Sequence, residues 1–205
     1  MLSGMASPFR RPGSSAERDP RLPPGQYDTG ASFPVLTAEV SPRLDISTWT
    51  FRIDGLVGSA QEWTWDQIHA LPGSSYDGDI HCVTTWSKLG TSFGGVSVDD
   101  LLAAAGPLPE ATHVVAWSHS GYTTNLPLAD VTGGKAWVVW DHEGAPLPLQ
   151  HGGPARLLVP HLYFWKSAKW VGGLRVIDHD EPGFWETRGY HDRGDPWLEQ
   201  RYTGD

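Results

Sequence analysis

Apolar and polar residues alternate along several short stretches of the chain, and this period predicts strands. At residues 49–53 Trp, Phe and Ile alternate with Thr and Arg, the two-residue period of a half-buried strand. Asp54-Gly55 predicts a turn directly afterwards. Further strands are predicted at residues 113–117, 136–140, 156–159 and 173–177.

Two other stretches carry helix signals. Residues 65–71 predict a short helix that Pro72-Gly73 ends. Ser97 followed by Asp100 is close to a capping box, with Asp in place of the usual Glu, and predicts a helix that closes at Gly106-Pro107. Short helices among several strands do not make a repeating βαβ pattern. The chain therefore predicts an α+β fold that is mostly β, with mixed sheets.

The two ends of the chain lack this period. Residues 1–26 are rich in Pro, Arg, Ser and Gly and predict an extended N-terminal arm or tail. Residues 27–205 are predicted as a single domain, because a chain of 22.5 kDa suits one core. The polar C-terminal stretch is expected to pack on the body through its aromatic residues, Trp185, Tyr190, Trp197 and Tyr202.

Charge and composition exclude several classes of partner. A net charge of −9 argues against binding to nucleic acid or to anionic membranes by the chain as a whole. No apolar run reaches the roughly 18 residues of a membrane span. The Phe9-Arg10-Arg11 stretch is followed by Pro12-Gly13 and not by an apolar segment, so no secretion signal is expected. With one cysteine and no such signal, a reducing cytoplasm is the expected location.

The acidic residues are unevenly distributed. Residues 144–177 contain no Asp or Glu, and residues 80–98 contain none either, although Lys88 is present there. The first of these segments holds four cations, Arg156, Lys166, Lys169 and Arg175. An acidic chain that clears carboxylates from a basic segment favours a local anion site. Chance clustering on a solvated face is the alternative.

Cys82 is the only cysteine and follows His81 in a stretch rich in hydroxyls, Thr84-Thr85-Trp86-Ser87. One cysteine excludes an internal disulfide and a zinc site of several thiolates. Three roles stay open for it: an inert buried thiol, a nucleophile, or a single thiolate bond to a metal that another molecule mostly holds. Nearby hydroxyls, such as that of Thr84, suit a polar ligand around such a metal, and His81 and Lys88 are candidate cations that favour the thiolate.

Two further segments offer groups that bind anions. His151-Gly152-Gly153-Pro154 predicts a tight turn where the backbone approaches a ligand, and Arg156 follows it with a guanidinium fork that suits phosphate or a polar heterocycle. Lys166-Ser167-Ala168-Lys169 lies among large aromatic residues and can grip a phosphate. The alternatives are an arginine paired with a surface acid and amphipathic lysines that reach to solvent.

Other catalytic templates are missing. The sequence contains no G-x-S-x-G, G-x-G-x-x-G, P-loop or H-E-x-x-H motif. The nine histidines are spread without the close spacing of a metal cage, so most are expected to be ordinary polar residues.

Taken together, residues 81–87, 151–160 and 163–173 resemble the molybdopterin-binding domain of the sulfite oxidase family, and most closely its short, haem-free bacterial members. The resemblance runs from about residue 33 to residue 176 and extends into the tail at residues 182–186 and 189–191. It implies the sulfite-oxidase-type fold, a molybdenum–molybdopterin cofactor without haem, and an outside redox partner.

The resemblance also implies roles for individual residues. Cys82 matches the cysteine that ligates molybdenum; Arg156 matches the arginine of the pterin motif, and His151 falls where a reductase branch of the family has an Asn. Ser167, Ala168 and Lys169 match the element that holds the terminal phosphate, and Lys166 beside them is a further candidate cofactor-binding residue. Thr84 and Ser118 are further candidate cofactor contacts, and His81, Tyr122 and Tyr163 are candidate substrate-facing residues.

Two departures from the family pattern bear on the substrate. Residues 83–87 lack the arginine that sulfite oxidases carry shortly after the cysteine, and a sulfite dianion wants such a group beside the metal. The Asn-rich signature of the N-terminal pterin loop is missing at residues 33–37. The predicted function is oxygen-atom transfer, or related two-electron chemistry, on a small substrate. The alternatives are a non-catalytic molybdopterin-binding or carrier protein, and a cysteine-nucleophile enzyme with His81 or His151 as base.

Overall fold

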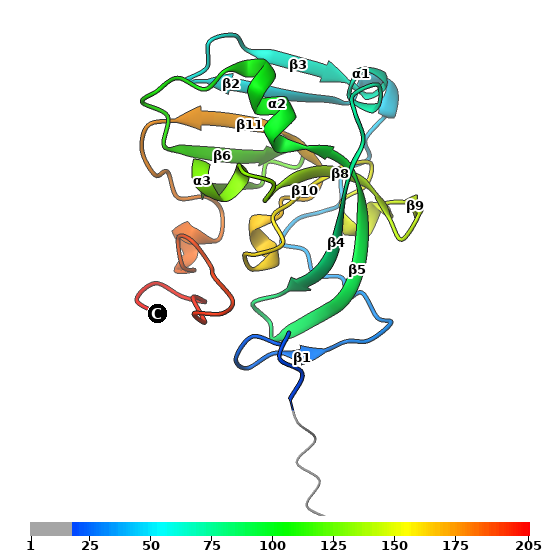
Figure 1. Cartoon of the computed structure of the whole chain (residues 1–205), viewed down its shortest axis with the longest axis vertical. Coiled ribbons are helices and arrows are strands. Elements are labelled where there is room, and N and C mark those ends of the chain that lie inside the picture. Colours follow the sequence, from blue (N-terminus) through cyan, green and yellow to red (C-terminus); the bar gives the residue numbers. More distant parts are fainter. Residues whose placement is uncertain (1–17) are drawn as a thin grey trace, which may run out of the picture.

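Two β-sheets with short helices beside them make up the computed structural model, which describes residues 18–205 (Figure 1). The five-stranded sheet has the order β3-β2-β11-β6-β7. β11 runs parallel to β2 and antiparallel to β6, so this sheet is mixed. Its strands are β2 (Thr50–Gly55), β3 (Gln61–Thr64), β6 (His113–Ser118), β7 (Thr123–Pro127) and β11 (Val171–Ile177).

The six-stranded sheet is built around one long strand, β5, which pairs with β1, β4 and β8. The β4–β5 hairpin extends away from the five-stranded sheet towards the lower end of the molecule (Figure 1). The tip of this hairpin therefore lies at the end of the molecule away from the five-stranded sheet (Figure 1). The strands are β1 (Tyr27–Asp28), β4 (Ser74–His81), β5 (Trp86–Ser97), β8 (Trp137–His142), β9 (Ala145–Pro146) and β10 (Arg156–Leu158).

The helices are short, and their first residues explain where they begin. Thr64 and Gln67 form a complete capping box at the start of α1 (Trp65–His69). At α2 (Val98–Ala105) the Ser97 hydroxyl accepts only from the Asp99 N–H, so the box predicted there is a simple N-cap. The remaining elements are α3 (Leu128–Val131) and the 3₁₀ turns η1 (Ile46–Thr48), η2 (Leu149–His151), η3 (Phe164–Lys166) and η4 (Glu186–Arg188).

Two apolar clusters form the core. The larger lies between the two sheets and under α2. It includes Phe51, Leu101 and Leu157, whose exposed fraction is 0%. The smaller surrounds the β4–β5 hairpin and includes Trp86, Phe164 and Cys82 itself. Cys82 thus lies at the margin of an apolar cluster, on the part of the hairpin farthest from the main core.

The α+β, mostly β fold predicted from the sequence is confirmed, and β2, β6, β8, β10, β11, α1 and α2 lie where the pattern predicted them, to within about two residues. The turn predicted at Asp54-Gly55 is wrong, because both residues still pair with β11. β3, β4, β5 and β7 were missed. β5 contains three glycines and three serines, which weaken its strand signal.

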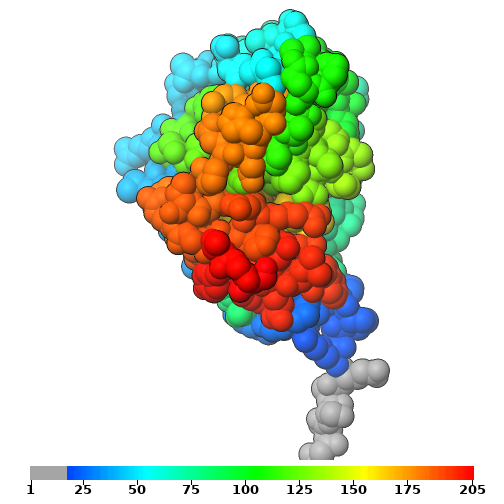
Figure 2. Space-filling model, turned by 90° about the vertical axis from the view of Figure 1, so that its left-hand side faces the viewer, coloured from blue at the N-terminus to red at the C-terminus, as the bar shows by residue number. Residues whose placement is uncertain are grey.

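Residues 18–30 and the C-terminal segment lie close together near the hairpin, where Arg201 donates to the carbonyls of Val83 and Pro24. Of the arm predicted at residues 1–26, residues 1–17 lie outside the described residues and residues 18–26 are described. Gln26 is buried, and its Nε2 donates to the Cys82 carbonyl at 3.0 Å. The C-terminal segment covers one face of the lower half, close to residues 18–30 (Figure 2). Within it Trp185 and Tyr190 pack on each other, whereas Trp197 is half exposed. Among residues 18–205 no helix is long and apolar enough to cross a membrane.

Candidate cofactor-binding site

Cys82 lies in the tight turn that joins β4 to β5. Its N–H donates to the Trp86 carbonyl at 2.8 Å, and the Thr85 N–H donates back to the Cys82 carbonyl at 3.0 Å. Thr85 adopts a left-handed backbone with φ 77°, which closes the turn. The Cys82 side chain is 8% exposed, and its Sγ lies 3.2 Å from the Thr84 hydroxyl. The thiol is thus held at the hairpin tip with one polar neighbour.

A cavity of about 290 Å³ opens beside Cys82. Its walls come from separate parts of the chain: the loop at residues 33–39, the hairpin tip, Tyr122 just before β7, the segments around η2 and η3, and the C-terminal segment. A cavity of this size with convergent polar groups suits a small organic ligand. The sequence-predicted residues that line it are Cys82, Thr84, Tyr122, His151, Arg156, Ser167, Ala168 and Lys169.

Arg156 is fixed at the start of β10 and is 1% exposed. Its Nη1 donates to the His151 carbonyl at 2.7 Å and its Nη2 to the Ser167 carbonyl at 2.6 Å. The guanidinium lies over the Phe164 ring at 3.9 Å. Burial lowers the pKa of Arg156, because the charge has lost its water. The side chain nevertheless brings a positive charge to the cavity wall.

Lys169 brings a second charge to the same wall. Its Nζ donates to the carbonyls of Leu36 and Gln150 at 2.6 and 2.7 Å. Burial, and after it the charge of Arg156, lowers the pKa of Lys169 to about 8. In the described part of the chain, every hydrogen-bond acceptor of these two cations is a neutral carbonyl. Two such charges in one wall favour an anionic ligand that would offset them.

The backbone around η2 and η3 adds donors to this wall. Within residues 18–205 the N–H groups of Ala168 and Lys169 donate no hydrogen bond, although both residues line the cavity. Gly152 has φ +110°, and a Cβ there would lie 3.0 Å from Arg156 Cβ and from Lys169 Cα. Only glycine lets the two basic segments approach this closely. The arrangement resembles the backbone sites that bind phosphate in other proteins.

His151 and Tyr122 complete the lining without adding charge. The His151 ring stacks on Phe33 with centroids 3.8 Å apart. Burial, and after it the charges of Arg156 and Lys169, lowers the pKa of His151 to about 4, so the imidazole is neutral at pH 7. The Tyr122 hydroxyl donates to the Trp165 carbonyl at 2.7 Å, and burial raises its pKa well above its usual value.

Four predicted site residues lie outside this cavity. His81 faces a second groove, because neighbouring strand residues point to opposite sides, and its Nδ1 lies 2.7 Å from the Ser87 hydroxyl. Tyr163 is fully buried behind the wall. The Ser118 hydroxyl donates to the Lys169 carbonyl at 2.5 Å and so supports the wall from behind. The Lys166 ammonium does not line the cavity and forms an ion pair with Glu186 at 2.6 Å.

The charge argument from the sequence is only partly met by the structure. Of the four cations in the acid-free segment, Arg156 and Lys169 reach the cavity, while Arg175 pairs with Glu181 on the surface. Lys88 donates towards the Gly30 carbonyl at 3.4 Å, away from the thiol. Burial raises the pKa of the Cys82 thiol; the hydrogen bond with Thr84 and, after it, the charge of Arg201 oppose that rise. The cation that favours the Cys82 thiolate is therefore Arg201, from the C-terminal segment, and not Lys88 as expected.

Several lining residues were not predicted as site residues. Trp165, Trp185 and Tyr190 form an aromatic side of the cavity, and Phe33 and Glu39 come from the N-terminal loop. Glu39 is the one carboxylate among the lining residues. The density of aromatic residues in the C-terminal stretch was the available signal for Trp185 and Tyr190. Nothing in the local sequence indicates which of those rings reaches the cavity.

The side chains present fit a metal that is held largely by an organic ligand. Among residues 18–205 no group of three or more His, Cys, Asp or Glu side chains could hold a metal ion alone. The Cys82 thiol lines the same cavity as two cations and two N–H groups that donate no hydrogen bond among the described residues. Cations and N–H donors of this kind suit an anionic organic group. The residues therefore fit the molybdenum cofactor that the sequence resemblance implies, and Cys82 would be its protein ligand.

Comparison with known proteins supports this fit. The family model described as "Oxidoreductase molybdopterin binding domain" matches residues 38–185. An uncharacterised oxidoreductase, YuiH of Bacillus subtilis, is 42% identical over 191 residues, which are 93% of this chain and 96% of YuiH.

More distant relatives include longer proteins. The catalytic subunit MsrP of a protein-methionine-sulfoxide reductase from Gluconobacter oxydans is 28% identical over 67% of this chain and 49% of its own. Mitochondrial sulfite oxidase of Rattus norvegicus is 25% identical over 73% of this chain and 33% of its own, so the chain spans half of these two relatives or less. In structure, the sulfane dehydrogenase SoxCD of Paracoccus pantotrophus superposes with a TM-score of 0.64 at 22% identity, covering 73% of this chain and 46% of that chain, which shows a shared fold.

Proposed function

The chain belongs to the oxidoreductase molybdopterin-binding domain family, and we propose that it binds a molybdenum cofactor through Cys82 to transfer oxygen atoms to or from a small substrate. Its relatives make it a molybdopterin-dependent oxidoreductase of the sulfite oxidase family.

One observation carries the proposal: the only thiol of the chain shares a cavity with two cations whose partners are neutral carbonyls. Glu39, in the same lining, offsets part of the Lys169 charge. A ligand with negative charge would remove the remaining cost of burying two positive charges. A thiol alone would fit an inert core residue, and the cations alone would fit any phosphate. Their convergence favours a ligand that carries both a metal and a phosphate.

The side chains have separate tasks in this proposal. When bound, the cofactor supplies the two-electron change between Mo(VI) and Mo(IV) that accompanies oxygen-atom transfer. Cys82 binds the metal as a thiolate and loses its proton on binding. Arg156 and Lys169, with the N–H groups of Ala168 and Lys169, hold the negative charge of the pterin phosphate. Tyr122 holds Trp165 in place through its hydrogen bond.

The wall near the thiol favours a substrate without a strong negative charge. Residues 83–87 carry no arginine, and the side of the cavity formed by Trp165, Trp185 and Tyr190 is aromatic. Such a wall binds an apolar group and a weakly polar oxygen better than a sulfite dianion. A sulfoxide is a substrate of this type, and MsrP, one of the relatives, is named for that reaction.

Electrons have to reach the site from another molecule in this proposal. A chain with one cysteine holds no CxxCH motif for haem attachment. A separate redox protein or small carrier is therefore proposed as the partner, and the cytoplasm as the location.

The experiment is a substrate screen of cofactor-loaded protein with a reduced viologen dye as donor and ferricyanide as acceptor. Sulfoxides, N-oxides, nitrate and sulfite are the four classes tested, with Arg156→Met as the matched variant. Turnover of a neutral oxide that falls in proportion to the molybdenum lost by Arg156→Met supports the proposal. Fully loaded protein that turns over none of the four classes is a cofactor-binding or carrier protein instead, and the proposed reaction is then wrong.

A further inference from the structure

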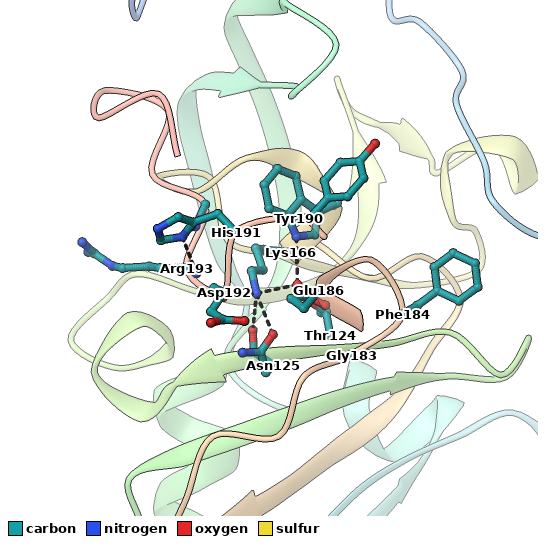
Figure 3. Close-up of polar contacts among 12 residues, drawn as sticks. Thr124, Asn125, Lys166, Gly183, Phe184, Glu186, Tyr190, His191, Asp192 and Arg193 are labelled. Atoms are coloured by element: carbon teal, nitrogen blue, oxygen red, sulfur yellow. Dashed lines mark hydrogen bonds and ion pairs between the residues drawn. The ribbon is translucent and has the colours of Figure 1, made fainter. Parts of the chain in front are cut away.

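A buried ion pair lies directly behind the aromatic side of the cavity. Lys166 Nζ and Glu186 Oε1 are 2.6 Å apart, and both side chains are 0% exposed (Figure 3). The ammonium also donates to the side chain and the carbonyl of Asn125, each at 2.8 Å. Glu186 Oε1 also accepts from the Thr124 hydroxyl and the Trp165 indole N–H, at 3.0 and 2.9 Å. The pair thus joins β7, η3 and the C-terminal segment.

Neither member of the pair lines the cavity, but their neighbours in the chain do. Trp165 and Ser167 flank Lys166, and Trp185 precedes Glu186; all three line the cavity. Tyr190 packs on Trp165 and on Trp185 with ring centroids 5.3 and 4.7 Å away. We call Trp165, Trp185 and Tyr190 the aromatic wall. The Lys166–Glu186 pair contacts this wall directly, through the hydrogen bond from the Trp165 indole to Glu186.

The C-terminal segment has little regular structure and is held on the body by individual contacts, such as the Arg193–Asp130 ion pair. After β11 its one regular element among the described residues is the three-residue turn η4. Gly183 lies so close to β7 that a Cβ would come within 2.5 Å of Thr124 Cα, and the Phe184 N–H donates to the Thr123 carbonyl. Glu186 follows this close approach at once. An ion pair at this point decides the direction in which the segment leaves β7.

A buried ion pair of this kind contributes little net stability, because the cost of removing both charges from water offsets their attraction. Removing two charges from water is expensive, and apolar residues of similar size often replace such a pair without loss. Five hydrogen-bonding groups surround the Lys166 ammonium and Glu186 Oε1, whereas the buried Glu186 Oε2 has no hydrogen-bond partner among the described residues. A geometric role for the pair accounts for this arrangement better than a stabilising one.

We propose that the Lys166–Glu186 ion pair is a positioning device that holds the aromatic wall over Cys82 and so limits the size of the substrate that reaches the metal. The inference rests on the proposed function for its substrate. It assigns Lys166 to the C-terminal segment and not to the cofactor phosphate. Glu186 is a positioning residue, because it acts through Trp165 and Trp185.

The sole cysteine gives a readout that needs no cofactor. In the proposed arrangement a bulky maleimide reaches Cys82 of the full-length, cofactor-free protein past the aromatic wall, so the labelling rate reports how often that wall opens. In Glu186→Gln the carbonyl oxygen still accepts from Trp165 and Thr124, but the charge is gone. Labelling of this variant should be about tenfold faster than in the wild type, because the wall opens more often. The control is Glu181→Gln, whose partner Arg175 lies on the exposed surface, and it should label at the wild-type rate.

A second variant covers the case in which Glu186→Gln does not fold. Lys166→Met/Glu186→Met removes both charges and leaves an apolar pair of similar volume, which favours folding. It should unfold at a temperature similar to that of the wild type and yet label faster, because Trp165 and Thr124 have lost their acceptor. Wild-type labelling in this folded double variant would overturn the proposal.

The loaded enzyme provides the functional test. In Glu186→Gln the molybdenum content should stay at the wild-type level, while kcat/KM for a bulky substrate rises relative to that for a small one by about tenfold. Unchanged size discrimination together with lower thermal stability would show a merely structural role and overturn the inference. If the wild type itself takes up no molybdenum, the proposed function fails, and the labelling comparison still decides the role of the pair.

Discussion

His151 makes the stability of this protein depend on pH in a way that one substitution can isolate. Its imidazole is 6% exposed, stacks on Phe33 and lies near Arg156 and Lys169. Burial, and after it those two charges, lowers its pKa from 6.5 to about 4. His151→Asn keeps a planar polar side chain and removes the titrating group, so the variant should lose this part of the pH dependence.

The magnitude follows from the two pKa values. Above pH 6.5 the imidazole is neutral in both the folded and the unfolded chain, and the contribution is absent. Between pH 6.5 and about 4 the unfolded chain binds a proton that the folded protein does not bind. The free energy of unfolding therefore falls as the pH falls, and the loss from pH 7 to pH 5 is about 2 kcal/mol.

Urea unfolding at pH 7 and pH 5 measures this directly. The difference in the free energy of unfolding between the two pH values should be about 2 kcal/mol smaller in His151→Asn than in the wild type. Other histidines contribute equally to both proteins and cancel. His179→Asn, whose side chain is 65% exposed, is the control and should follow the wild type. An equal pH dependence in His151→Asn and the wild type would refute the idea that His151 is buried neutral between two cations.

Three further predictions concern the cavity wall and its support. Lys169→Met should weaken retention of the cofactor by about tenfold or more, measured as molybdenum per chain after dialysis, because it removes a charged hydrogen-bond donor. Gly152→Ala should destabilise the protein by about 1–3 kcal/mol in urea unfolding, since its Cβ would press on Arg156 and Lys169 in a left-handed backbone. Gly134→Ala, which is left-handed but faces open space, should cost about 1 kcal/mol. Although burial raises the pKa of Asp130, hydrogen bonds from His161 and Arg193 hold it well below its usual range, so Asp130→Asn should cost about 1–2 kcal/mol at pH 7. The difference in the free energy of unfolding from the wild type should narrow below about pH 4.

Each of these three has a result that contradicts it. Cofactor retention that is unchanged in Lys169→Met would remove that lysine from the site. Equal costs for the Gly152 and Gly134 substitutions would show that the close approach of the basic segments is unimportant. A constant difference between Asp130→Asn and the wild type from pH 7 to pH 3 would show that this carboxylate is not held ionised by its partners.

The fold could be predicted from the sequence where the apolar period is regular. β2 and α2 bury residues at the spacing of a strand and of a helix, and both were found. β4 and β5 were missed because Ser, Asp and Gly fill positions where strand formers are expected. These strands are stable because they pair with each other and with β8, which no local pattern reports.

The site could be predicted to the extent that its residues carry charge or a unique group. Cys82, Arg156 and Lys169 stood out because a lone thiol and an acid-free basic segment are visible in the sequence. Lys166 carries the same charge as Lys169, but only the fold shows that Glu186 neutralises it. Residues adjacent in sequence can point to opposite sides of the backbone. His81 and Lys166 therefore face away from the cavity that their neighbours Cys82 and Ser167 line.

The bond between Cys82 and molybdenum is the central claim, and X-ray absorption at the molybdenum edge tests it most directly. Wild-type protein and a folded Cys82→Ser variant are loaded with cofactor, and the sulfur neighbours of the metal are compared. The account predicts that the variant has one sulfur neighbour fewer and has lost its activity. The same number of sulfur neighbours in both proteins would contradict it.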